Sequence, residues 1–309
     1  MKKLALSTVL LLSSATMSQA EIFFGGYLTL EHDSERFTFG PPAVDYGNIR
    51  GETLIGYQNN NFTIAGGLSF TESDHPFGSG IEIDHEDLFG LVSFNNITLT
   101  FGHFYGAGNV VSEDYFGLDD VTSEDDDTLR VDYDGGKFHV AASYSFEADE
   151  WELGLSTKIG DQFIRAGYES DSEELFVLTG REFGNWGYHL AGVYDFDFSG
   201  APPFLSRGQI GATLLYNFNS DFSVAANVAF DVDQLDLHSY GIIGWYEFGS
   251  PFGSLGQPTL RIEYVEEILG QPFEFKSIEV SLVIPFGKST PAGYERQPNK
   301  EEFKNFGFF

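Results

Sequence analysis

Acidic side chains dominate the groups in this sequence that could do chemistry. The 309-residue chain has 47 acidic and 16 basic residues, and the densest acidic stretch lies between residues 113 and 127. Ca²⁺ takes six to eight oxygen ligands, which carboxylates supply. The sequence therefore offers a candidate calcium site, made of Asp119, Asp120, Glu124, Asp125, Asp126 and Asp127. Their spacing matches no EF-hand loop, and the alternative interpretation is a solvated acidic loop that holds no ion.

Catalytic chemistry has less support. Paired carboxylates can cleave glycosidic bonds, but 47 acids make such pairs inevitable and therefore uninformative. The sequence has no G-x-S-x-G or H-E-x-x-H motif and its seven histidines are scattered, while the lack of cysteine excludes thiolate zinc sites and cysteine nucleophiles. The formal net charge of −31 makes nucleic acid a poor partner, because phosphate repels it. We expect neither an enzyme nor a nucleic-acid-binding protein.

The first twenty residues predict an export signal. Lys2 and Lys3 form a positive start, residues 4–12 form a short apolar run, and Ser18-Gln19-Ala20 has the small residues of a cleavage site. The apolar run is too short to span a bilayer, and no other run of about 18 apolar residues occurs. The expected mature chain begins at Glu21 and has no transmembrane helix.

The rest of the sequence repeats a two-residue alternation. Between Phe222 and Asp231, larger apolar residues occupy every second position, and small or polar residues stand between them. Such alternation over about ten residues predicts a strand with one apolar and one polar face. Sixteen segments of this kind are expected: 21–32, 49–58, 62–72, 85–94, 97–104, 128–134, 137–146, 151–159, 162–169, 175–183, 186–197, 207–218, 222–231, 238–248, 259–266 and 275–286.

The connections between these segments alternate in length. Tight turns rich in Gly, Asn and Asp, such as Asn95-Asn96 and Gly135-Gly136, alternate with links such as 33–48, 73–84 and 105–127. An up-and-down antiparallel meander produces this order, with short turns at one end and longer links at the other. We therefore predict an all-β fold of about sixteen strands.

Two architectures use such strands: a soluble sandwich and a transmembrane β-barrel. The polar faces favour the barrel, because Arg50 and Glu52 share one face with Gly and Ser, as in a water-filled lumen. Aromatic residues end many apolar faces, for example at Tyr133 and Tyr264, as in an interfacial girdle. Aromatics also favour strands in general. The alternative is therefore a secreted or surface-exposed carbohydrate-binding β protein, whose aromatics bind sugars.

The order of these parts resembles the general diffusion porins of Gram-negative outer membranes, particularly the sixteen-stranded alphaproteobacterial type. The resemblance covers about residues 21–286, and includes the opening segment, the long link after the fifth segment and the closing segment Ser277–Phe286 with its terminal aromatic. It implies a multi-pass β-barrel in the bacterial outer membrane, in contact with lipid and lipopolysaccharide. It also implies a homotrimer and a channel for passive diffusion of small hydrophilic solutes, without a cofactor.

The resemblance further implies a pore constriction, because the third external loop of these porins folds into the barrel and sets carboxylates against wall arginines. The loop corresponds to residues 105–127 here. The matching residues are Glu113, Asp114, Asp119 and Asp120 on the loop, with Arg50 and Arg130 on the wall. Other charges with inward parity are Glu52, Asp132, Lys158, Arg165, Arg207, Arg261 and Glu263. The acid excess predicts selectivity for cations. The alternative for each arginine is a structural ion pair with a wall acid.

Residues 287–309 depart from these porins, whose chain normally stops at the last strand. The segment contains Pro, Lys and Glu without alternation, and then Phe306-Gly307-Phe308-Phe309. A flexible periplasmic tail, an anchor, a segment that re-enters the lumen, and an assembly signal at Phe309 are all compatible with it. The expected organisation is a signal peptide (1–20), a barrel (21–286) and this tail (287–309).

Overall fold

The regular elements are strands throughout the part of the chain that the structure describes. The computed structural model describes residues 21–37, 44–59, 62–74, 80–107, 124–196, 207–232, 237–249, 258–268 and 274–287. Within these ranges the chain forms sixteen strands: β1 (Glu21–Phe37), β2 (Val44–Asn59), β3 (Phe62–Ser73), β4 (Gly80–Phe94), β5 (Ile97–Tyr105), β6 (Glu124–Asp134), β7 (Phe138–Ser145), β8 (Glu150–Ile159), β9 (Gln162–Glu169), β10 (Glu174–Phe183), β11 (Trp186–Asp195), β12 (Gly208–Asn217), β13 (Phe222–Asp231), β14 (Leu237–Glu247), β15 (Thr259–Ile268) and β16 (Glu274–Gly287). No helix among the same residues is long and apolar enough to cross a bilayer.

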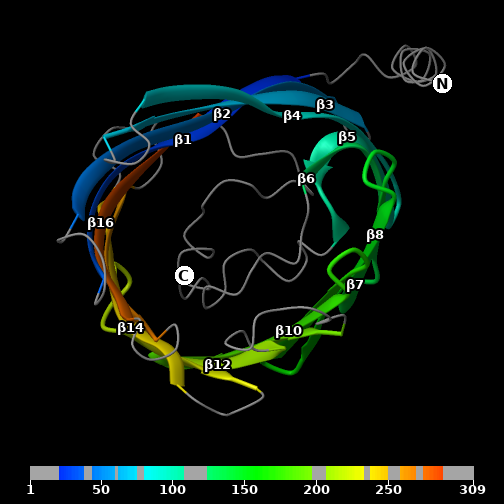
Figure 1. The fold of residues 1–309 in the computed structure, drawn as a ribbon. Helices are drawn as coiled ribbons and strands as arrows, with labels where there is room; N and C mark the ends of the chain where they lie inside the picture. The colour runs from blue at the N-terminus through cyan, green and yellow to red at the C-terminus, as the bar shows by residue number, and fades with distance from the viewer. Residues whose placement is uncertain are drawn as a thin grey trace.

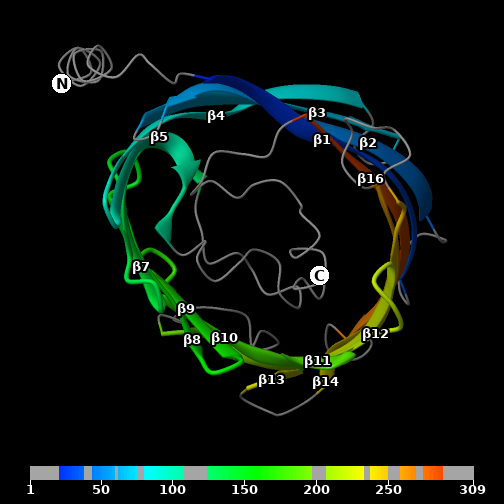
Figure 2. The same ribbon diagram turned by 180° about the vertical axis from the view of Figure 1, so that it is seen from behind.

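The strands close into one barrel in which each strand pairs antiparallel with its neighbours in sequence. Figures 1 and 2 show the ring from its two ends, with β1 beside β16. The β1–β16 pairing runs from Gly25↔Gly287 to Phe37↔Phe275 and leaves the sheet without an open edge. The predicted sixteen-stranded antiparallel barrel is confirmed, and the soluble sandwich is excluded.

The two ends of the barrel differ in their connections. The turns after β2, β4, β6, β8, β10 and β12, the start of β1 and the end of β16 lie at one end, which we call the short-turn end. The opposite end is called the link end. At the short-turn end, Asn95, Gly136, Gly160 and Gly184 have φ between 53° and 78°. This left-handed conformation lets turns of two or three residues reverse the chain, and it explains the Gly and Asn at these positions.

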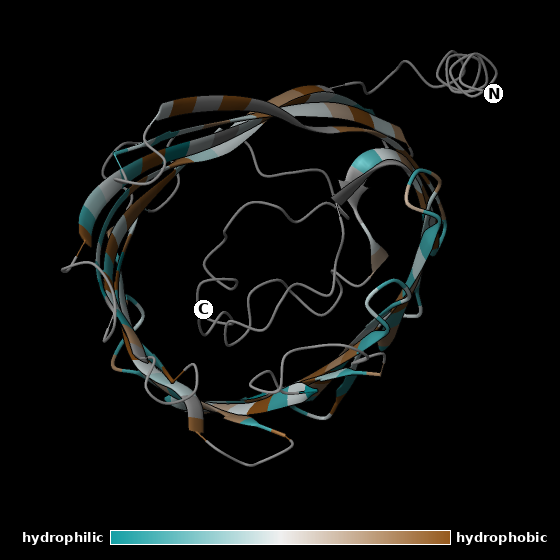
Figure 3. Ribbon diagram, in the orientation of Figure 1, coloured by the Kyte–Doolittle hydropathy of each residue, from teal (hydrophilic) through white to brown (hydrophobic). Residues whose placement is uncertain are grey.

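Alternation gives each strand an outer and an inner face, and hydrophobic and hydrophilic residues alternate along many strands in Figure 3. Large apolar side chains are exposed on the outer face, for example Ile22 (75%), Leu88 (66%) and Ile242 (52%). On the inner face, Ser223, Ser239 and Ser281 are buried. An exposed apolar surface that surrounds a whole barrel is unfavourable in water and suits lipid.

Aromatic side chains of the outer face gather at both ends of the barrel. At the short-turn end, ring centroids are 4.6 Å apart in Trp186–Tyr216 and 5.7 Å apart in Phe24–Phe286. At the link end, Trp151–Tyr168 and Tyr194–Phe196 are 5.1 and 5.0 Å apart. Two such belts are the pattern expected where a barrel crosses both interfaces of a bilayer.

Four strands extend four or five residues further toward the link end than the alternation predicts. β1 continues to Phe37, β2 begins at Val44, β4 begins at Gly80, and β6 begins at Glu124. The expected links 33–48, 73–84 and 105–127 are therefore partly strand. Asp33 pairs with Tyr46, and Ser73 with Gly80, at positions without an alternating apolar face. In these hairpins the two strands remain paired through their backbones beyond the last residue of the alternating apolar pattern.

The inner face carries apolar as well as charged side chains. Three apolar clusters lie on it, and their members are at most 9% exposed. The first rim cluster, near the short-turn end, contains Phe23, Leu54, Ala65, Phe89 and Leu91. The second rim cluster, also near that end, contains Leu215, Ala225, Ile243 and Trp245. The third cluster contains Phe176, Leu178, Ala191, Val193 and Ala229.

Candidate functional site

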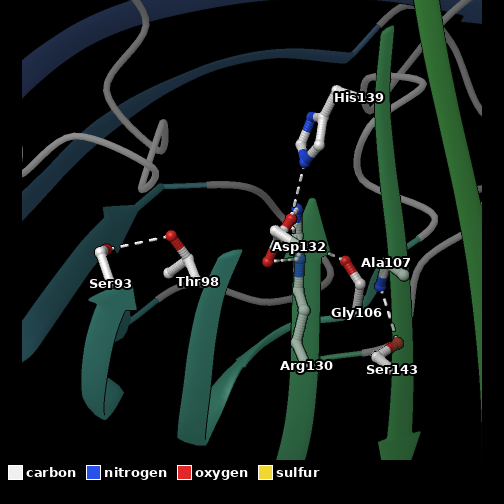
Figure 4. Close-up of polar contacts among 8 residues, drawn as sticks. All are labelled: Ser93, Thr98, Gly106, Ala107, Arg130, Asp132, His139 and Ser143. Atoms are coloured by element: carbon white, nitrogen blue, oxygen red, sulfur yellow. Dashed lines mark hydrogen bonds and ion pairs between the residues drawn. The ribbon is translucent and has the colours of Figure 1, made fainter. Parts of the chain in front are cut away.

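A three-residue charge network on β6 and β7 forms the best-defined polar site of the inner wall (Figure 4). Arg130 and Asp132 share the inner face of β6, because they are two residues apart. The Arg130 Nη2 and Nε atoms donate to Asp132 Oδ1 at 2.7 and 3.0 Å. The Nε2 atom of His139, on β7, is 2.9 Å from the same oxygen. Asp132 therefore joins an arginine and a histidine, and the network contains as many permanent positive as negative charges.

The same network holds the first residues of the link after β5. Arg130 Nη1 donates to the Gly106 carbonyl oxygen at 2.9 Å, and the Ala107 N–H donates to Ser143 Oγ at 2.7 Å. Ala107 is fully buried, and a Cβ at Gly106 would overlap the Glu152 carboxylate. Residues 106–107 therefore lie against the inner wall formed by β6, β7 and β8. The loop acids Glu113, Asp114, Asp119 and Asp120 lie outside the described residues, so the constriction stays a prediction.

A second network, on β15, β16 and β1, carries an excess of negative charge. Arg261 forms an ion pair with Glu263 on its own strand, and its Nη1 atom is 3.9 Å from Glu279 Oε1 on β16. The register sets Glu263 opposite Glu279, and Glu279 opposite Asp33 on β1. Three carboxylate residues thus stand side by side on adjacent strands, around Arg261. Neighbouring like charges of this kind raise the negative potential of a wall.

The acidic row continues along β1 and has neutral donors on β2. Glu31, Asp33 and Glu35 share the inner face of β1. The Asn48 Nδ2 atom donates to Glu31 Oε1 at 2.8 Å, and the Tyr46 hydroxyl donates to Glu35 Oε1 at 2.6 Å. We did not predict these three acids or Glu279 as site residues. Their spacing at i, i+2 and i+4 is the signal that could have found them, but the expected strand ended at residue 32.

The predicted wall arginines occupy separate parts of the barrel. Arg50 lies on the inner face of β2, opposite Thr29 and Thr71. The register row of Arg130 passes through Thr100, Leu91 and Thr63 and reaches β2 at Gln58. Gln58 is eight residues closer to the short-turn end than Arg50. Arg50 and Arg130 therefore do not share a register row, and Arg130 forms an ion pair with Asp132.

The other predicted wall charges are spread around the barrel. Arg165 lies on β9 with its guanidinium carbon 5.4 Å from the ring centroid of Phe163, and Lys158 pairs with Phe163 across β8 and β9. Arg207 immediately precedes β12 at the link end, and Glu52 stands opposite Tyr27 on β1. These residues are distributed over β2, β8, β9 and the position before β12.

The calcium prediction stays open. Glu124, Asp125, Asp126 and Asp127 are the first four residues of β6, whereas we expected them in a loop. Asp119 and Asp120 lie outside the described residues. The part of the chain that the structure describes has no group of three or more His, Cys, Asp or Glu residues arranged to hold a metal ion.

Known proteins share the fold of this chain but not its sequence. No protein-family model matches the sequence, and no curated protein sequence matches it. Two solved variants of the porin of Rhodopseudomonas blastica align with TM-scores of 0.63 and 0.62, each at 14% identity, over 86% of this chain and all of theirs. A structure described under asymmetric conductivity of engineered proteins aligns with a TM-score of 0.63 at 15% identity, with the same coverage. The resemblance to an alphaproteobacterial sixteen-stranded porin is thus confirmed for the fold.

Proposed function

We propose that the protein is a porin of the bacterial outer membrane, a water-filled channel through which small hydrophilic solutes diffuse passively. One observation carries the proposal: the sixteen strands close into a barrel with an apolar outer face and a charged inner face. In lipid, a closed barrel satisfies its backbone hydrogen bonds without water, while inward charges need an aqueous lumen. The fold shared with the R. blastica porin supports the same function.

The charge distribution supports selectivity for cations. Asp33, Glu263 and Glu279 stand together on one side of the barrel, and Glu152 and Glu169 face each other on β8 and β9. A wall with excess carboxylate concentrates cations and excludes anions, more strongly at low ionic strength. The loop acids 113–120 would add to the same potential.

The remaining features of the proposal concern partners. Lipid and lipopolysaccharide would contact the outer face, and a homotrimer is the assembly that the resemblance implies. Divalent ions such as Ca²⁺ could bridge acidic external residues, because carboxylates are their usual ligands. The proposed transport needs no cofactor and no catalytic group, since it rests on diffusion through a charged opening.

Planar-bilayer recording of the purified, detergent-extracted protein tests both parts of the proposal. Discrete conductance steps are expected, with a reversal potential in a KCl gradient that favours potassium over chloride. A folded protein that produces no steps would contradict the channel. Steps with a reversal potential that favours chloride would contradict the selectivity alone.

A further inference from the structure

The charge network on β15, β16 and β1 contains hydrogen-bond donors as well as an excess of negative charge. Arg261 Nη2 donates to Glu263, and Arg261 Nη1 is 3.9 Å from Glu279 Oε1, which is beyond hydrogen-bond distance. The other N–H groups of this guanidinium make no hydrogen bond within the part of the chain that the structure describes. The Arg261 side chain is 24% exposed, so part of it faces the lumen. It can therefore donate to an acceptor group of a solute.

Two carboxylates that are partly open to the lumen stand beside this arginine. Glu279 is 22% exposed, and Glu31 is half-buried. The register sets Ser281 opposite both Arg261 and Glu31, and Glu279 is two residues from Ser281 on β16. Neighbouring strands are about 4.8 Å apart, so the Cα atoms of Arg261 and Glu31 are about 10 Å apart. One small solute above Ser281 can reach the charged ends of all three longer side chains.

Basic side chains compensate these carboxylates only in part. Glu31 accepts a hydrogen bond from Asn48, whose amide is neutral, and no basic residue in the described ranges forms an ion pair with Glu31. Asp33 stands opposite Glu279 and adds a further negative charge. The single arginine of the network already has Glu263 as an ion-pair partner, so it does not neutralise the others. An ammonium group would supply the missing positive charge.

Together these donors and carboxylates favour one class of solute. The acidic residues would repel an anion, and a simple cation would leave the guanidinium donors unused. A neutral solute would replace water at charged groups with little gain. A zwitterion brings an ammonium group for the carboxylates and a carboxylate for the guanidinium, and both contacts are charge-assisted hydrogen bonds. Amino acids carry the two groups close together on one small molecule.

We propose that Arg261, Glu31 and Glu279 form a binding subsite for zwitterionic solutes of the amino-acid class. The Arg261 guanidinium donates to the carboxylate of the solute, and Glu31 and Glu279 accept from its ammonium group. A solute that pauses at this subsite is enriched in the lumen relative to a neutral solute of the same size. The enrichment rests on the proposed channel function, whereas binding to the folded barrel does not.

Saturation-transfer NMR of the full-length, folded protein in detergent tests the binding. The probes are alanine, which is a zwitterion, lactamide, which is its neutral constitutional isomer, and alaninamide, which keeps the ammonium group and lacks the carboxylate. The alanine signal should exceed the lactamide signal at least about threefold, because only alanine makes both charge-assisted contacts. Equal signals for these two isomers would overturn the proposal.

Variants assign the two ends of the solute. Arg261→Gln should lower the alanine signal at least about threefold and should not lower the alaninamide signal. Glu31→Gln combined with Glu279→Gln should lower both signals at least about threefold. The matched control is Arg165→Gln, which also removes one inner-wall arginine, but on β9, on the far side of the ring from β16 (Figure 2). It should leave the alanine signal within about 1.5-fold.

Each variant is compared only if it keeps the heat-modifiable gel shift of a folded barrel. The carboxylate pair keeps the proposal open to refutation if Arg261→Gln does not fold, because an alanine signal unchanged by Glu31→Gln with Glu279→Gln would overturn it. An equal fall in Arg261→Gln and Arg165→Gln would reduce the effect to net charge and also overturn it. Alanine binding without conductance steps would support the subsite and contradict the channel, whereas steps without alanine binding would contradict the subsite alone.

Discussion

The two charge networks of the inner wall differ in how they balance charge. On β6 and β7, Asp132 contacts both Arg130 and His139, and Arg130 also holds the Gly106 carbonyl. On β15, β16 and β1, the carboxylate residues Glu263, Glu279 and Asp33 are adjacent around Arg261. The balanced network fixes backbone, whereas the unbalanced one leaves a net negative potential. Charged residues of the inner wall thus have a structural role on β6 and β7 and an electrostatic role on β15, β16 and β1.

The largest expected effect comes from removing the charge excess. Asp33→Asn, Glu263→Gln and Glu279→Gln together should lower the potassium-to-chloride permeability ratio about three- to tenfold. Each lost charge contributes a few tenths of a kcal/mol at aqueous dielectric values. The reversal potential in a KCl gradient measures the ratio.

Asp132→Asn combined with Arg130→Gln is the matched control for that experiment, because it removes one carboxylate and one guanidinium and leaves the net charge of the wall unchanged. The ratio should change by less than about 1.5-fold. An equal fall in both proteins would show that the two networks do not differ in the way we infer.

The next largest effect is expected on the stability of the folded barrel, which should fall more for Arg261→Gln than for Arg130→Gln. Arg261→Gln removes the cation from beside Glu263, which is 4% exposed, and from Glu279, and should cost about 2–3 kcal/mol. Arg130→Gln should cost about 1 kcal/mol, because Asp132 keeps its contact with His139. The temperature at which the folded gel band converts to the unfolded one measures the difference. Equal temperatures for the two variants would remove this contrast.

The structural role of the balanced network can be tested at the backbone that it holds. Gly106→Ala adds a Cβ that overlaps the Glu152 carboxylate, so the start of the link after β5 must move from the wall. Single-channel conductance should change by about 20–50%. Gly80→Ala is the control, because a Cβ there meets no atom within 4 Å, and it should leave conductance unchanged.

The smallest expected effect is that of His139→Gln. His139 is 37% exposed, and glutamine can still donate a hydrogen bond to Asp132. The cost at neutral pH should be at most about 0.5 kcal/mol, as for other partly exposed pairs. Thermal conversion of the folded band within error of the unchanged protein is the expected result. A loss as large as that of Arg130→Gln would make His139 an essential member of the network.

The fold was largely predictable from the sequence, because alternation and turn residues are local signals. The segments 162–169 and 222–231 coincide with β9 and β13. The errors lie at the link end, where β1 continues to Phe37 and β6 begins at Glu124. Backbone pairing continues there after the apolar face has ended, and no residue-level pattern marks the last pair.

The site was less predictable, because contacts across the wall depend on register. Arg130 and Asp132 were predicted as wall residues, but the contact of Arg130 with Gly106 depends on how the chain bends after β5. In the row formed by Asp33, Glu279 and Glu263, Asp33 is about 230 to 246 positions away from the other two residues in the sequence. Glu279 and Glu263 lie on the neighbouring strands β16 and β15. A single sequence does not specify such a register. The apolar clusters were missed because Phe23 and Trp245 occupy the face that alternation assigned to water.

The pairing of β1 with β16 also has a consequence for the order in which the barrel can form. Every other pairing joins consecutive strands and can arise as a hairpin while the chain is still incomplete. The β1–β16 pairing joins the first and the last strand, so it must form after all the others are available. Until then two strands expose unpaired backbone groups, which lipid cannot satisfy. Membrane insertion of this protein should therefore be completed by one late zipping step, and a chain that lacks β16 should have no stable inserted form.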